Sequence, residues 1–216
     1  MKAKSAGFTL LEIMIVIALL AVLIGLAAPS FGDFIRNSRL TGKANDMLAG
    51  LNLARTEAIK RHVPVTVCAT DDVEAVTPEC DADADFGQWI VFVDDGSDPD
   101  DPADPLDPIV DPANGTFEPG AGEVLLLRSS PSIASIATLP SADVEGYVQY
   151  GLDGFQRRDG GAAPTDLTIL MCDDRGNKAV SGPDISAARA VFVSRTGRAE
   201  VSRSVDRIDL LEEECP

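Results

Sequence analysis

The first 28 residues constrain this chain more than any other stretch, because a short basic leader precedes a long apolar run. Phe8 to Ala28 is 21 residues long and contains one charge, Glu12. A helix of roughly 20 apolar residues crosses a bilayer core of about 30 Å, so the run predicts a membrane-spanning helix over 8–28. Lys2 and Lys4 favour a cytoplasmic amino terminus, which leaves the rest of the chain on the other side of the membrane.

Glu12 is unusual within this run. A carboxylate at membrane depth costs roughly 2.5–3.5 kcal/mol and marks a functional site. Cleavage between Gly7 and Phe8 would free an ammonium group on Phe8, and this group could pair with Glu12 of a neighbouring subunit. A secretory signal is cut after its apolar core, not before it. The alternative interpretation is a plain signal anchor with an unrelated glutamate near its end.

The hexapeptide Gly7-Phe8-Thr9-Leu10-Leu11-Glu12 resembles the processing site of type IV pilins and type II secretion pseudopilins. This resemblance implies a prepilin peptidase that removes leader 1–7 and methylates the new terminus at Phe8. It also implies a single-pass inner-membrane protein with a periplasmic head, which an assembly platform in the inner membrane incorporates into a filament of other major and minor subunits.

A second helical pattern follows over 29–61. Its apolar residues recur at spacings of three and four, which predicts one buried face; they are Phe31, Phe34, Ile35, Ala44, Met47, Leu48, Leu51, Ala54 and Ala58. Gly25, Pro29 and Gly42 weaken a helix locally. The two patterns together predict one long helix, with its second half packed on a head.

Residues 62–216 have the composition of a β domain. Runs rich in Val, Ile, Thr and Phe, separated by Gly, Pro and Asp, predict strands at 63–69, 88–94, 123–129, 133–139, 146–151, 166–172, 188–194 and 198–202. The expected fold class is therefore α+β, with an antiparallel head packed on the long helix.

Several head motifs resemble the GspH/FimT (FimU-like) group, which contains minor pilins and the minor pseudopilin of type II secretion. They lie at 51–61 with 65–68, at 87–94, at 122–125 and at 194–198. The resemblance covers nearly the whole chain and implies a pilin-like fold. Residues 98–118 depart from it, because they are longer and more acidic than the group suggests.

The charge of this chain is unevenly distributed. Of its 35 acidic residues, 17 lie between Asp71 and Glu123, where there is no Lys or Arg. Loop 94–122 is expected to be extended and exposed, because its Asp-Pro steps oppose helix and its charges repel. Four of its carboxylates form a weak Ca²⁺ candidate, Asp94, Asp95, Asp98 and Asp100, but their spacing does not match an EF-hand loop. A solvated acidic loop is the favoured interpretation.

Four cysteines lie on the side of the membrane where disulfides persist, and they allow three pairings. Proximity in the sequence favours Cys68–Cys80, which leaves Cys172–Cys215 to hold the C-terminal tail. A zinc site is the alternative. It has little support, because there is no C-x-x-C pair and His62 is the only histidine.

Arg195, Arg198 and Arg203 form a candidate site for DNA contact. Some members of the resembled group bind DNA through a Gly-Arg-x-Arg tail, but here Gly197-Arg198-Ala199 is followed by Glu200. The net charge of −17 also opposes binding to a duplex. The favoured interpretation is an edge strand whose charges prevent edge-to-edge pairing.

Enzymatic function has little support in the sequence, because His62 lacks the context of a catalytic triad and no Gly-rich phosphate loop is present. No cofactor is expected. Three functions remain. The first is a minor pilin of a type IV pilus that primes or caps the filament in motility or adhesion. The second is a minor pseudopilin of a type II secretion system. The third is a DNA-binding minor pilin for natural transformation.

Overall fold

The computed structural model describes residues 7–81, 83–93, 124–144, 146–157, 165–180, 182–209, 211 and 215, without the side chains of 26–30. The acidic loop 94–122 and its four Ca²⁺ candidates therefore lie outside the described residues. The chain forms two compact units, Met1–Arg39 and Leu40–Pro216. The second unit is called the head below.

One helix, α1 (Leu10–Arg61), contributes to both units. It is continuous through Gly25, Pro29 and Gly42, where the sequence predicts weak points. Its end is well defined. The His62 N–H donates to the Ala58 carbonyl at 3.0 Å, and His62 has a φ of 57°. This left-handed residue closes the last turn as a C-cap, a place that glycine usually takes.

The helix is buried in the head along one stripe. Six of its side chains have no exposed surface, and their spacing of three and four places them on one face; they are Leu40, Ala44, Met47, Leu51, Ala54 and Ala58. The predicted stripe began earlier, at Phe31. That part of the prediction is wrong for the head, because Phe31, Phe34 and Ile35 precede Leu40 and are exposed.

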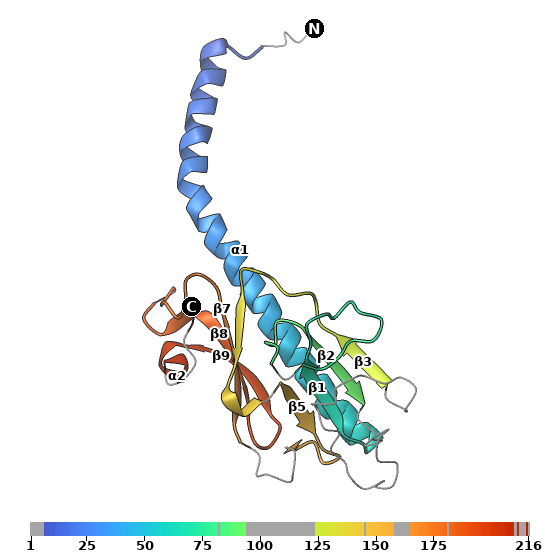
Figure 1. The fold of residues 1–216 in the computed structure, drawn as a ribbon. Coiled ribbons are helices and arrows are strands. Elements are labelled where there is room, and N and C mark those ends of the chain that lie inside the picture. Colours follow the sequence, from blue (N-terminus) through green and yellow to red (C-terminus); the bar gives the residue numbers. More distant parts are fainter. Residues whose placement is uncertain are drawn as a thin grey trace, which may run out of the picture. The chain divides into compact units, whose positions relative to one another are not determined.

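The described strands of the head form two antiparallel sheets (Figure 1). The first has the order β3-β2-β1-β5-β6, built from β1 (Val65–Ala69), β2 (Trp89–Val93), β3 (Val124–Arg128), β5 (Tyr147–Tyr150) and β6 (Gln156–Arg157). The second has the order β4-β7-β8-β9, built from β4 (Ala137–Pro140), β7 (Leu167–Cys172), β8 (Ile185–Val193) and β9 (Ala199–Ser204). The α+β expectation is confirmed.

Both sheets contribute to one central core with the helical stripe. Val67 of β1, Ile169 of β7 and Val191 of β8 are fully buried in the same cluster as Leu51. Neither sheet alone has a face large enough to fold without a partner layer. The helix therefore supplies the layer on which both sheets depend.

Each sheet also buries its outer face. Cys68, Ile90 and Phe92 point away from the helix and pack with Val73 of the β1–β2 connection. Leu170, Cys172 and Ala190 of the second sheet pack with Ile208 of the short helix α2 (Val205–Ile208). Burial on both faces explains why β1 and β7, apart from one threonine each, are apolar throughout and do not alternate between apolar and polar residues.

A disulfide ties down the segment that covers the outer face of each sheet. Cys68 of β1 is bonded to Cys80, and Cys172 of β7 is bonded to Cys215, which are the pairs that sequence proximity favours. The cysteines are oxidised, so they offer no thiolate for the alternative zinc site.

One local expectation is wrong, and two short elements were not predicted. The strand expected at 133–139 begins only at Ala137, because Ile133–Ile136 closes as a turn through the Ile136 N–H and Ile133 carbonyl. The short strand β6 and helix α2 were not expected. Each is too short for a periodic pattern and depends on the packing around it.

The contact between Gly50 of α1 and Trp89 of β2 generates a stability prediction. A Cβ at Gly50 would overlap the Trp89 indole, which is 3% exposed and has no room to move. The overlap should lower the unfolding free energy of Gly50→Ala by about 1–3 kcal/mol. The higher helix propensity of alanine offsets about 1 kcal/mol of this loss. Chemical denaturation of the head measures the change.

Gly42→Ala is the matched control, because nothing lies within 4 Å of its Cβ position on the same helix. It should raise the unfolding free energy by about 0.5–1 kcal/mol. Equal stabilisation by both alanines would show that the indole does not restrict position 50.

Candidate functional site

The processing site lies at the start of α1. Gly7 and Phe8 precede the helix and are exposed. Thr9 is its N-cap, because its Oγ1 accepts a hydrogen bond from the Glu12 N–H at 3.2 Å. Glu12 is thus the third helical residue, where a carboxylate is favoured by the helix dipole. This capping role of Glu12 was not predicted, although Thr9-x-x-Glu12 is the capping-box pattern.

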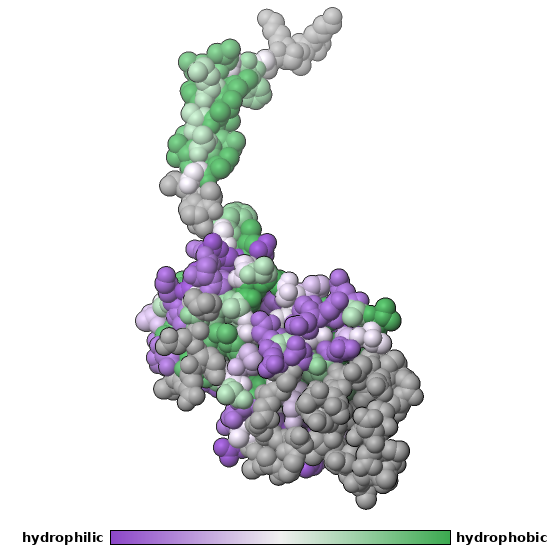
Figure 2. All heavy atoms as spheres, viewed as in Figure 1, coloured by the Kyte–Doolittle hydropathy of each residue, from purple (hydrophilic) through white to green (hydrophobic). Residues whose placement is uncertain are grey.

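The helix beyond this cap is apolar on the face that Figure 2 shows. Residues 13–24 include no polar side chain, so the other faces are apolar as well. Every side chain from Leu10 to Ile24 is exposed, and the large apolar ones are 50–78% exposed. A helix that packs one face on a soluble domain shows an apolar stripe and a polar face. This segment has no polar face, so it needs an apolar environment on every side.

Within the described part of the chain, no helix combines the length and the apolar character needed to cross a membrane.

Lys43 anchors the helix to the segments that precede β2 and follow β3 of the first sheet. Its ammonium group donates to the carbonyls of Gly87, Ser130 and Pro131 at 3.3, 2.9 and 2.7 Å. Burial lowers the pKa of Lys43, and the carboxylate of Asp46 opposes this effect. Gly87 belongs to the Gly87–Asp94 motif, so that motif serves in part to receive this lysine.

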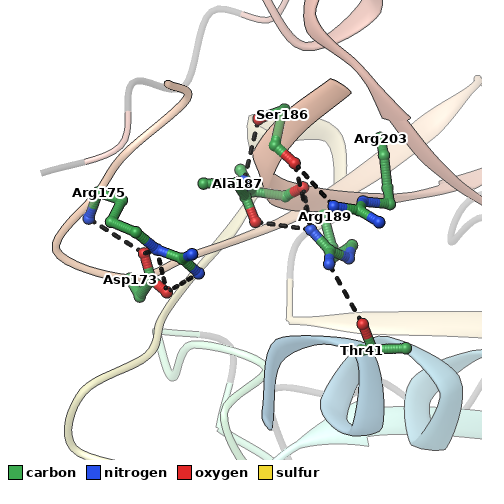
Figure 3. A network of polar contacts seen from close by, with 8 residues as sticks. Thr41, Asp173, Arg175, Ser186, Ala187, Arg189 and Arg203 are labelled. Carbon is green, nitrogen blue, oxygen red and sulfur yellow. Dashed lines mark hydrogen bonds and ion pairs between the residues drawn. The ribbon is translucent and has the colours of Figure 1, made fainter. Parts of the chain in front are cut away.

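Arg189 anchors the helix to the second sheet (Figure 3). Its side chain is 1% exposed, and one Nη donates to the Ala187 and Ala188 carbonyls at 2.6 and 3.0 Å. The other Nη donates to Thr41 Oγ1 of α1 at 3.2 Å. Thr41 and Lys43 thus attach neighbouring positions of the helix to different sheets.

The charge around Arg189 is unbalanced. Desolvation lowers its pKa to about 10, and the guanidinium groups of Arg203 and Arg175 act in the same direction. Asp173 is the nearby carboxylate, and it accepts two hydrogen bonds from Arg175 Nε at 3.0 and 3.1 Å. Backbone carbonyls therefore stabilise the Arg189 charge. Sequence reasoning missed Arg189, because a single arginine in an apolar strand gives no sign of its partners.

The Ser194–Arg198 motif is a tight turn between β8 and β9. The Gly197 N–H donates to the Ser194 carbonyl at 2.7 Å, and the Ser194 N–H donates to the Arg198 carbonyl at 2.9 Å. Gly197 has a φ of 75° and lies against the Gly154 carbonyl and the Tyr150 ring. The motif therefore joins the turns of the two sheets, and its glycine is structural.

The three candidate DNA contacts are not equivalent. Arg195 is exposed near Asp166, and its backbone N–H donates to Asp166 Oδ1 at 3.1 Å. Arg198 is also exposed. Arg203 is half-buried and donates to the Ser186 carbonyl at 3.4 Å, beside Arg189. The structure therefore leaves only the first two at the exposed turn.

Arg207, in contrast, is tied down at the surface. It donates to Glu200 Oε1 at 2.7 Å and stacks over the Phe192 ring, 4.0 Å from its centroid. The hydrogen bond from Arg207 lowers the pKa of Glu200. Strand β9 is the edge of its sheet. Glu200 lies on this strand and Arg207 follows it in α2, so the edge carries charge, as the edge-strand interpretation expects.

No cluster of carboxylates, cysteines or histidines that could hold a metal ion is found among the described residues.

Two family models match the chain. One describes the prokaryotic N-terminal methylation motif and covers residues 2–28, and the other describes type II transport protein GspH and covers residues 43–197. A methylation segment that continues into the core helix of a β-rich head defines a pilin-class subunit. The chain belongs to the GspH family, which contains minor pilins and pseudopilins.

Curated relatives and solved structures are similar to parts of the chain. Fimbrial protein Q of Moraxella bovis is 34% identical over 32% of this chain and 43% of its own length. The type IV major alpha-pilin of Moraxella bovis is 36% identical over 27% of this chain and 37% of its own length. The type IV minor pilin FimU of Pseudomonas aeruginosa is 16% identical, covering 80% of this chain and 98% of that one, with a TM-score of 0.47.

The Gly197 turn generates a second stability prediction. Gly197→Ala should destabilise the head in two ways, because the residue has a positive φ and its Cβ would overlap the Gly154 carbonyl. Gly182→Ala is the control, since Gly182 has a φ of 94° but no atom within 4 Å of its Cβ position. The control should cost about 1–2 kcal/mol.

Gly197→Ala should cost about 1–3 kcal/mol more than the control. Thermal or chemical unfolding of the two variants provides the comparison. If both alanines cost the same, the contact between the two turns does not hold the sheets together.

Proposed function

We propose that this protein is a minor pilin of a type IV pilus, with a structural role in priming the filament or forming its tip in motility or adhesion. The observation that supports this proposal is the distribution of apolar side chains along α1. Apart from Glu12, the helix is apolar on every side from Leu10 to Ile24, and from Leu40 onward one of its faces lies in the core of the head. Such a helix can occupy a bilayer before assembly and a bundle of like helices after it.

The proposed maturation follows from the same segment. Prepilin peptidase removes residues 1–7 and methylates Phe8. Residues 8–28 lie in the inner membrane and later in the filament core, and the head lies in the periplasm. The partners are other minor and major pilins and the inner-membrane assembly platform. A structural role of this kind requires neither an enzymatic site nor a cofactor.

A minor pseudopilin of a type II secretion system is the second candidate. The name of the matching family, type II transport protein GspH, supports it. The names of the curated relatives, a fimbrial protein and a type IV pilin, favour the pilus. Copurification with pilus subunits or with secretion-system subunits would distinguish the two.

DNA binding in natural transformation is the less favoured function. Arg203 is engaged with the Ser186 carbonyl, and Arg195 lies near Asp166. Two exposed arginines in a chain of net charge −17 give little phosphate neutralisation.

Substitution of Glu12 tests the proposal. If the carboxylate pairs with the methylated terminus of an adjacent subunit, Glu12→Val and Glu12→Gln should both reduce incorporation into filaments to a small fraction of wild type. Immunoblots of sheared filaments measure incorporation. Mass spectrometry should show that each variant is still processed and begins at Phe8.

Glu12→Gln separates charge from capping, because glutamine also serves at this position of a capping box. Thr9→Val is the converse control, since it removes the cap and keeps the carboxylate. It should leave incorporation nearly intact. Normal incorporation of Glu12→Gln would contradict the proposed ion pair.

A further inference from the structure

The two ends of the first sheet carry two different surfaces. One is a groove lined by carboxylates, and the other is a projecting apolar turn with arginines around it. One end, beyond Ala69 and Trp89, has an open groove of about 630 Å³. The exposed carboxylates of Asp71, Asp83 and Asp85 line it together with apolar side chains, and the half-buried ones are Ala84, Ile133, Ile136 and Ala137. This surface is called the acidic groove below.

Two cations lie near the acidic groove, but neither belongs to its lining. Lys43 donates to the Gly87 carbonyl and is itself buried. Arg128 donates to the carbonyls of Val73 and Ala75, both at 2.6 Å. Both cations are thus bound to backbone carbonyls. The β1–β2 connection, residues 70–88, contains no Lys or Arg of its own.

The other end of the sheet carries an exposed apolar projection. Two backbone hydrogen bonds close the turn Gly151–Phe155. The Gly151 N–H donates to the Phe155 carbonyl at 2.9 Å, and the Gly154 N–H donates to the Gly151 carbonyl at 2.8 Å. Leu152 and Phe155 on this turn are 45% and 48% exposed, and Ile59 of α1 is 44% exposed. Gly154 lies directly against Ile59. These three apolar side chains are called the knob.

Basic side chains surround the knob. Arg55 Nε is 3.3 Å from the position that a Gly154 Cβ would occupy, Arg157 lies against Gly151, and Arg198 follows the Gly197 that contacts Gly154. Asp153 pairs with Arg157 at 3.0 Å. Among the described residues around Leu152 and Phe155, positive charge is therefore in excess.

The knob and the groove lie at opposite ends of β1. Tyr150, which precedes the knob turn, pairs with Val65 at the start of that strand, whereas Thr70 of the groove follows its end. One head therefore cannot insert its own knob into its own groove. A second copy of the chain can offer the complementary surface.

We propose that the knob of one copy docks in the acidic groove of a second copy, in a head-to-tail contact. Leu152 and Phe155 would bury against Ile133 and Ile136, and the surrounding arginines would face the groove carboxylates. Such a contact uses two different patches, so it leaves one free knob and one free groove on each pair and can add further copies, in a row or a ring. The inference rests on the head alone and does not depend on the proposed role in a pilus.

The contact should be weak in solution, because a single turn in a groove buries less surface than a stable interface requires. Sedimentation velocity of the head fragment 40–216 over a wide range of concentration is therefore the appropriate measurement. All buried apolar residues that the structure describes lie within this fragment. Its cooperative unfolding should be verified first.

Two variants each remove one half of the contact. Phe155→Asp breaks the knob and leaves the groove intact, and Asp83→Arg does the reverse. Each should weaken self-association by more than about tenfold. Val76→Asp is the control, because Val76 is 92% exposed but belongs to neither surface. It should associate as the wild type does.

A mixture of Phe155→Asp and Asp83→Arg gives the decisive result. The intact knob of one variant fits the intact groove of the other, so the mixture should form one-to-one dimers and nothing larger. A monomeric wild type, wild-type association of either variant, or a mixture that stays monomeric would overturn the proposal. Association that appears only after deletion of 95–122 would also overturn the proposal. It would indicate that the knob binds this acidic segment and not a second copy.

Discussion

The packing of one helical stripe between two sheets holds this head together. Leu40, Met47, Leu51 and Ala58 have no exposed surface, and both sheets place their inner side chains on them. Apolar burial is worth roughly 25 cal/mol per Å², so this shared core is the main source of stability. The two cation anchors, Lys43 and Arg189, then fix the position of the helix along each sheet.

The two disulfides perform equivalent tasks on the outer faces. Each begins at a strand residue that points away from the helix, and each ties down the segment that covers that face. By chain-entropy arguments, the bond with a separation of 12 residues contributes about 3 kcal/mol and the one with 43 about 4 kcal/mol. A small head with few aromatic residues benefits from both.

Much of this arrangement is predictable from the sequence, for identifiable reasons. The long helix, most strands and the disulfide pairs follow from apolar periodicity, β-branched runs and cysteine spacing. Contacts between segments far apart in the chain do not. Arg189 reaches Thr41, Lys43 reaches Pro131 and Gly197 reaches Gly154, and no local pattern encodes these partners. Arg198 of the Ser194–Arg198 motif was a candidate for DNA contact for the same reason. The structure shows that Gly197 of this motif serves the packing of two turns.

The part of α1 from Leu40 to Arg61 is an integral layer of the head and not an appendage to it. Unfolding of two fragments by denaturant, followed by circular dichroism, tests this role most directly. The fragment 40–216 should unfold cooperatively with both disulfides formed, whereas 63–216 should show no cooperative transition because its sheets lack their common layer. Cooperative unfolding of 63–216 with a similar midpoint would contradict the account.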